Sequence, residues 1–123
     1  IASALAIETV KPLIYVRSKP KDYGTSKSVE GKIHDGMKVV MIDDVATTGG
    51  SVVNAIKSLT EVNVPVKDAY VIVDRMEGAT ESLEGLGVKM HSILNILQIT
   101  EILYEQKMIG IEILEKVKKQ ISK

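Results

Sequence analysis

The chain has 123 residues and a mass of 13.4 kDa, which suits one compact domain and is too short for two ordinary ones. Hydrophobic residues make up 45% and the mean hydropathy is +0.11, so the chain can form an apolar core and does not have the composition of a disordered protein. Sixteen basic residues balance sixteen acidic ones and cysteine is absent. This argues against nucleic-acid or membrane binding through net charge, and excludes a disulfide framework or a thiolate metal site.

The chain carries no signal for a membrane or for secretion. No run approaches the ~20 apolar residues that a membrane-spanning helix needs, and no charged-then-apolar leader opens the sequence. Together with the absence of cysteine, this makes a reducing cytoplasm the simplest compartment. The first residue is Ile1, and it leads directly into a helix-like segment, so we expect the natural N-terminus to be missing.

The first part of the chain predicts a helix, a short strand and a long loop. Residues 2–9 are mostly good helix formers, and Lys11-Pro12 ends them. Residues 13–16 (LIYV) are a β-rich run. Residues 17–36 are rich in Lys, Gly, Ser and Asp without an apolar period. They predict a loop of about twenty residues, either a functional lid or a solvated connection.

The remaining sequence alternates between strands and helices. The apolar runs 38–42 (KVVMI) and 67–73 (KDAYVIV) predict strands of a parallel sheet, the first buried on both faces. Helices are predicted at 51–62 and 80–86, and an edge strand at 88–93. Two amphipathic helices are predicted at 96–105 and 109–121. The lysines at 116, 118, 119 and 123 suit the end of the last helix, and a nucleic-acid patch is the less favoured alternative at zero net charge.

This alternation predicts an α/β fold with β-α-β units, right-handed crossovers and a parallel sheet flanked by helices. Ligands bind such sheets at the carboxyl ends of the strands. Three polar segments follow predicted strands, at residues 17–24, 43–51 and 74–78. We therefore expect the functional side chains to converge at that edge.

The most informative stretch is residues 39–51, VVMIDDVATTGGS. Gly49 and Gly50 let the backbone approach a ligand closely, and the hydroxyls of Thr47, Thr48 and Ser51 add donors. The following helix contributes its positive end, so the stretch predicts a phosphate cradle. It is not of the Walker type, because no Lys follows the glycines, and the nearest imitation, residues 31–36 (GKIHDG), precedes a strand.

Two carboxylates, Asp43 and Asp44, precede the cradle. They would repel a phosphate unless they hold sugar hydroxyls, a divalent cation, or both. A ribose phosphate would satisfy both halves of the pattern. The alternative is a plain strand-to-helix turn with Asp44 as a turn residue, but such a turn needs no paired acids.

The stretch 39–51 resembles the phosphoribosyl-pyrophosphate (PRPP) signature of the type I phosphoribosyltransferases, which have a Rossmann-like parallel sheet flanked by helices. Residues 14–31 (IYVRSKPKDYGTSKSVEG) are similar to the mobile catalytic loop of the orotate phosphoribosyltransferases, and residues 71–79 (VIVDRMEGA) to their Asp-Arg-x-x-Gly stretch. The resemblance covers nearly the whole chain. It implies transfer of the 5-phosphoribosyl group from PRPP to orotate, giving orotidine 5′-phosphate and pyrophosphate.

The resemblance also implies roles for individual residues. Thr47 and Arg75 would contact orotate, while Lys21 and Asp44 would be catalytic. Mg²⁺ would be carried by the pyrophosphate, with no direct metal ligand from the protein. The implied PRPP-binding residues are Arg17, Lys21, Tyr23, Asp43, Asp44, Val45, Ala46, Thr47, Thr48, Gly49, Gly50 and Ser51. Within this set, Arg17 and Lys21 would bind pyrophosphate from the mobile loop.

Two residues of the loop differ from the family pattern, and the resemblance also implies a domain content and an oligomeric state. Ser18 stands where the family usually has Lys, and Tyr23 where it often has His. Residues 1–123 would form the core domain without the family's N-terminal hood and pyrophosphate loop. Because the family's mobile loop reaches into the neighbouring subunit's site, the resemblance implies a homodimer, with small-molecule substrates and neither a nucleic-acid nor a membrane partner.

Other readings of these residues remain open. A PRPP-binding regulator would keep the cradle without needing Lys21. A transferase for a purine would be expected to carry an apolar or aromatic loop where this chain has Asp74-Arg75, which suits an anionic base. Arg75 could also be an ordinary ion-pair partner of Asp74 or Glu77.

Overall fold

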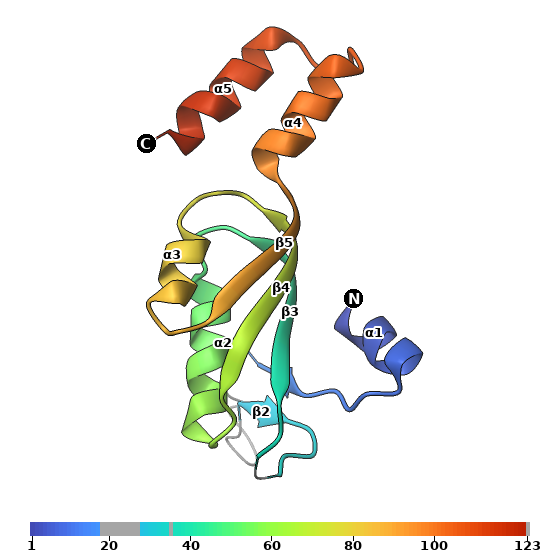
Figure 1. The fold of residues 1–123 in the computed structure, drawn as a ribbon, viewed down its shortest axis with the longest axis vertical. Helices are drawn as coiled ribbons and strands as arrows, with labels where there is room; N and C mark the ends of the chain where they lie inside the picture. The colour runs from blue at the N-terminus through green and yellow to red at the C-terminus, as the bar shows by residue number, and fades with distance from the viewer. Residues whose placement is uncertain (18–27, 35, 123) are drawn as a thin grey trace.

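A computed structural model describes residues 1–17, 28–34 and 36–122 (Figure 1). Its centre is a parallel sheet with the order β3-β4-β5, made of β3 (Val39–Ala46), β4 (Val66–Asp74) and β5 (Lys89–Asn95). Helix α2 (Gly50–Glu61) connects β3 to β4, and α3 (Ala79–Glu84) connects β4 to β5. The predicted α/β fold is confirmed, as is the position of β5 at an edge of the sheet.

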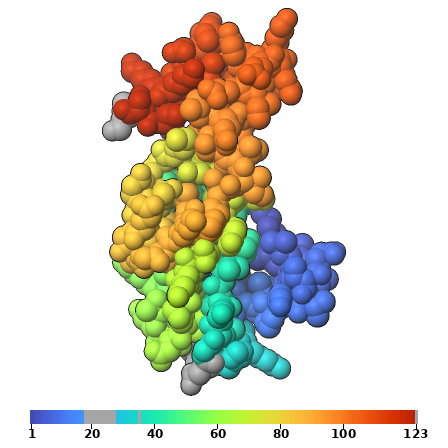
Figure 2. All heavy atoms as spheres, in the orientation of Figure 1, coloured from blue at the N-terminus to red at the C-terminus, as the bar shows by residue number. Residues whose placement is uncertain are grey.

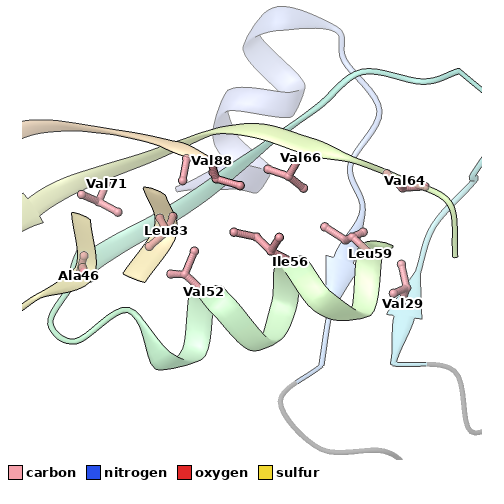
Figure 3. Packing of buried hydrophobic residues seen from close by; sticks show 12 residues of the cluster. Val29, Ala46, Val52, Ile56, Leu59, Val64, Val66, Val71, Leu83 and Val88 are labelled. Carbon is pink, nitrogen blue, oxygen red and sulfur yellow. The ribbon is translucent and has the colours of Figure 1, made fainter. Parts of the chain in front are cut away.

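Helices α2 and α3 cover one face of the sheet and enclose the core (Figures 1 and 3). Val52, Ile56 and Leu59 lie three or four residues apart on α2, so they share one helical stripe, and each is at most 4% exposed. Opposite them lie buried aliphatic side chains from the strands, from α3 and from the connections, namely Val64, Val66, Ala69, Val71, Leu83 and Val88. The core is aliphatic, as the composition predicts.

The other face of the sheet is largely uncovered within the described residues. Exposed fractions there are 52% for Val40, 44% for Tyr70 and 72% for Ile93. The prediction that the first strand is buried on both faces is therefore wrong. Helix α1 (Ala2–Thr9) lies on this side of the sheet (Figure 1), but none of its residues is buried.

The predicted strand at residues 13–16 is shorter than expected and lies outside the parallel sheet. It is β1 (Tyr15–Val16), which pairs antiparallel with β2 (Val29–Glu30), inside the segment predicted to be a loop. Val29 is 7% exposed and lies beside Leu59 near the end of α2 (Figure 3). A buried valine thus gives part of the predicted loop a structural role.

The chain ends in a helical hairpin beyond the carboxyl edge of the sheet (Figures 1 and 2). Helix α4 (Ile96–Glu105) follows β5 directly, because Asn95 and Gln98 form a reciprocal capping box with bonds of 2.8 and 2.9 Å. Helix α5 (Ile111–Ile121) packs back against α4 and buries Leu114. Both helices were predicted to within two residues.

Substitution of Leu83 tests the packing of the core between the sheet and its helices. Its side chain is 0% exposed, whereas that of Leu86, three residues later, is 40% exposed. Leu83→Ala is expected to lower the free energy of unfolding by about 3 kcal/mol, because it leaves a cavity, while Leu86→Ala costs under about 1 kcal/mol. Urea titrations followed by circular dichroism measure both, and equal losses would contradict the packing described.

Candidate functional site

The carboxyl end of β3 carries the stretch predicted to bind a ligand. The strand ends at Ala46 and not at residue 42 as predicted, because its pairing with β4 continues to Ala46 opposite Asp74. Asp43 and Asp44 therefore lie on the strand, and the prediction that the polar segment begins after the strand, at residue 43, is wrong. The loop itself is only residues 47–49, and α2 begins at Gly50.

The acid pair is held by its own backbone. The Asp44 N–H donates to Asp43 Oδ1 at 2.9 Å, and the Val45 N–H donates to Asp44 Oδ1 at 2.8 Å. Partial burial raises the pKa of Asp43, and the charge of Asp44 raises it further, against the lowering by the backbone hydrogen bond. An open pocket beside the pair is lined by Ile1, Ala2, Ile42, Asp43 and Asp44.

The turn into α2 depends on Gly49. Its φ of 81° lies in the left-handed region, and an added Cβ would stand 3.2 Å from both Ala79 Cα and Leu83 Cδ1. Only glycine therefore lets the loop pack this closely on α3. No side chain of the described residues caps the first N–H groups of this 12-residue helix. Such a helix start favours an anion.

Two hydrogen bonds hold the loop against its neighbours. The Ser82 hydroxyl on α3 donates to the Thr48 carbonyl at 3.0 Å and lies 2.8 Å from the Gly78 carbonyl. The Arg75 N–H donates to the Ala46 carbonyl at 2.9 Å. The segment that follows β4 is thereby bound directly to the end of β3, as the expected convergence of these two polar segments requires.

Arg75 lies at the end of β4, and its side chain is 46% exposed. Its Nη2 is 2.6 Å from Glu77 Oε1, so the ion pair considered as an alternative is present in this structure. The turn that contains Arg75 is tight, since Met76 adopts a φ of 56° and its N–H donates to Asp74 Oδ1 at 2.8 Å. An exposed guanidinium beside the cradle can accept a planar carboxylate.

Arg17 does not join this group within one chain. Its Nε donates to Glu30 Oε1 at 2.6 Å, which raises the pKa of Arg17, and its N–H donates to the Ser28 carbonyl. That region packs near the C-terminal end of α2, a helix about 18 Å long whose other end forms the cradle (Figure 3). The expected convergence is therefore wrong for Arg17. Lys21 and Tyr23 lie outside the described residues.

Two further residues, Ser82 and Gln120, contact the site and were not predicted from the sequence. Ser82 follows Gly78 by one helical turn, a weak signal that sequence reasoning could have used. Gln120 donates from α5 to Glu77 Oε1 at 3.0 Å. No local pattern connects it to Glu77, which lies 43 residues earlier.

In the part of the chain that the structure describes, no group of three or more acidic or histidine side chains could hold a metal ion. Two neighbouring carboxylates still suit Mg²⁺ when phosphate or sugar oxygens complete its shell. The donor set thus fits a cation that arrives with a ligand. The same described residues contain no helix with the length and apolar character to cross a membrane.

The model of the phosphoribosyl transferase domain family matches residues 1–96 of this chain. The chain belongs to this family. The match includes the acid pair, the Gly49 turn and Arg75, so it covers every described part of the candidate site except Gln120.

Named relatives add detail to this assignment. The orotate phosphoribosyltransferase of Cenarchaeum symbiosum is 44% identical over 117 residues, which are 95% of this chain and 58% of that protein. That of Pyrococcus furiosus is 43% identical over 101 residues, 82% of this chain and 56% of that protein. The chain spans little more than half the length of these curated relatives.

The fold of this chain is also similar to that of solved phosphoribosyltransferase structures. The UMP synthase of Leishmania donovani superposes with a TM-score of 0.83 and 30% identity over 98% of this chain and 26% of that one. The orotate phosphoribosyltransferase of Aeropyrum pernix superposes with a TM-score of 0.66 and 40% identity, and the match covers 86% of this chain and 56% of that one. The orotate phosphoribosyltransferase of Mycobacterium tuberculosis in complex with PRPP superposes with a TM-score of 0.61 and 27% identity. That match covers 72% of this chain and 49% of that one.

Gly49→Ala tests the close packing of the loop. It is expected to lower the free energy of unfolding by about 2 kcal/mol, because it adds both left-handed strain and a clash. Gly50→Ala is the matched control, since its Cβ would meet only Thr48 Oγ1, at 3.9 Å. It should leave stability unchanged or raise it by up to about 1 kcal/mol. Chemical denaturation measures both, and equal effects would refute the role of Gly49.

Asp43→Asn tests the raised pKa of Asp43. A carboxyl group whose pKa is raised by folding stabilises the fold when protonated, and this stability is lost as pH rises through the raised pKa. The variant should therefore be more stable than the wild type at pH 7, and the difference should shrink as the pH falls below that pKa. Unfolding titrations at several pH values measure the trend, and a variant less stable at pH 7 would contradict it.

Proposed function

We propose that the protein carrying this chain is an orotate phosphoribosyltransferase of pyrimidine (UMP) biosynthesis. It would transfer the 5-phosphoribosyl group from PRPP to orotate, releasing pyrophosphate. The observation that carries the proposal is the bond of 2.9 Å from the Arg75 N–H to the Ala46 carbonyl, which joins the ribose-phosphate half of the site to a cation suited to an anionic base. The names of the relatives support orotate as that base.

The PRPP half of the site consists of the acid pair and the loop. We propose that the backbone from Thr47 to Ser51 and its hydroxyls hold the 5′-phosphate at the positive start of α2. Asp43 and Asp44 would accept the ribose hydroxyls, and Val45 and Ala46 would line the sugar. Breaking the anomeric bond builds positive charge on the sugar, so an ionised Asp44 would stabilise the transition state.

The base half would use Arg75 and Thr47. A guanidinium can bind the orotate carboxylate through two parallel hydrogen bonds, which fixes the plane of the ring. Thr47 is half-buried between the acid pair and α2, where its hydroxyl would lie between the base and the phosphate. A neutral purine would gain little from Arg75, which favours orotate over other bases.

The leaving pyrophosphate requires cations that do not come from the loops after β3 and β4. We propose that Mg²⁺ bound to pyrophosphate supplies charge neutralisation, and that Lys21 and Arg17, with Tyr23 beside them, contact the same group. The placement of Arg17 away from the cradle of its own chain supports a homodimer in which it serves the neighbouring subunit. The proposed setting is the cytoplasm.

The decisive assay follows the loss of orotate absorbance with PRPP and Mg²⁺, using the whole gene product that carries these 123 residues. Asp44→Asn is expected to lower kcat/KM for PRPP by tenfold or more, since a charged hydrogen bond is worth about 1.5–3 kcal/mol. Glu84→Gln on α3 is the control carboxylate, expected to change little. An inactive wild type, or full activity in Asp44→Asn, would overturn the proposal.

A further inference from the structure

The C-terminal helix α5 reaches the base half of the site through two consecutive side-chain contacts. Gln120 Nε2 donates to Glu77 Oε1 at 3.0 Å, and Arg75 Nη2 lies 2.6 Å from the same oxygen. A pocket at this junction is lined by Arg75, Glu77, Ile96, Val117, Gln120 and Ile121. The loop after β4, the start of α4 and the end of α5 therefore meet around one carboxylate.

This contact comes from a segment outside the matched family domain. The family model ends at residue 96, where α4 begins, so nearly all of the hairpin lies beyond it. In the described residues, α5 packs mainly on α4, and Gln120 supplies its side-chain hydrogen bond to the body of the domain. Among the described residues, the hairpin therefore has a side-chain hydrogen bond to the matched domain that leads to Arg75.

The contacts from Gln120 through Glu77 to Arg75 are better suited to orienting the guanidinium than to stabilising the fold. The Arg75 and Glu77 side chains are 46% and 24% exposed, so water screens their attraction and the pair adds little to folding. An arginine side chain has several freely rotating bonds, and a substrate must fix them when it binds. A carboxylate that is itself held by Gln120 fixes much of this freedom in advance, which is how pre-organisation raises affinity.

We infer that Gln120 is a positioning residue for the anionic base: through Glu77 it sets the direction of the Arg75 guanidinium. This inference rests on the proposed function. It assigns to the C-terminal hairpin a role in the affinity for the base and none in the binding of PRPP. The proposed PRPP loop is instead hydrogen-bonded to Ser82 and packs against Ala79, both on α3.

The test measures both Michaelis constants of Gln120→Ala in the whole gene product. KM for orotate should rise about fivefold, the effect of one ordinary hydrogen bond, because Gln120 acts on the base only through Glu77. The kcat and the KM for PRPP should change less than about twofold. Gln120→Glu, which sets a second carboxylate against Glu77, should raise KM for orotate further. Lys119→Ala, next to Gln120 on the same exposed helix, is the matched control and should leave both constants unchanged.

A double-mutant cycle shows whether Gln120 acts through Glu77. If it does, Glu77→Ala should raise KM for orotate by itself, and adding Gln120→Ala should cause no further rise. Additive effects, equal changes in both Michaelis constants, or the same change in Lys119→Ala would overturn the inference while leaving the proposed function intact. A wild-type protein that does not consume orotate would overturn both.

Discussion

The pairing of β3 with β4 up to Ala46 and Asp74 is the constraint on which the candidate site depends. Because both strands end together, the two segments that follow them leave the sheet side by side, and the Arg75 N–H can reach the Ala46 carbonyl. Helix α3 comes next in the chain and packs against Gly49, so the connection that places Arg75 also supports the phosphate loop. A ligand with two chemically different ends can therefore be held between two neighbouring backbone segments.

Two neighbouring groups at this edge of the sheet favour ligands of opposite charge. The start of α2 favours an anion, yet Asp43 and Asp44 stand directly before it, and partial burial raises the pKa of Asp43. Such an arrangement destabilises the empty protein at neutral pH. A molecule that offers hydroxyls or a cation to the acids and phosphate to the helix satisfies both, which is typical of a site maintained for binding at some expense of stability.

Much of this could be predicted from the sequence, because strong local patterns set the parallel strands, the helices and the Gly49 turn. The antiparallel pair of β1 and β2 was missed, since two-residue strands have no period to detect. The end of β3 was misplaced because aspartates disfavour strands, while pairing with β4 carries the strand through them. An apolar run such as KVVMI also cannot reveal whether a second layer covers the sheet. The contact of Gln120 with Glu77 joins distant residues, and no local pattern encodes it.

The central claim is that the acid pair and the Gly49 turn together bind one sugar phosphate. Crystals of the protein soaked with PRPP test it most directly. The account predicts density for a phosphate over the backbone N–H groups at the start of α2, with ribose hydroxyls within hydrogen-bond distance of Asp43 and Asp44. Phosphate bound elsewhere, with the acid pair and the loop free of ligand, would contradict it.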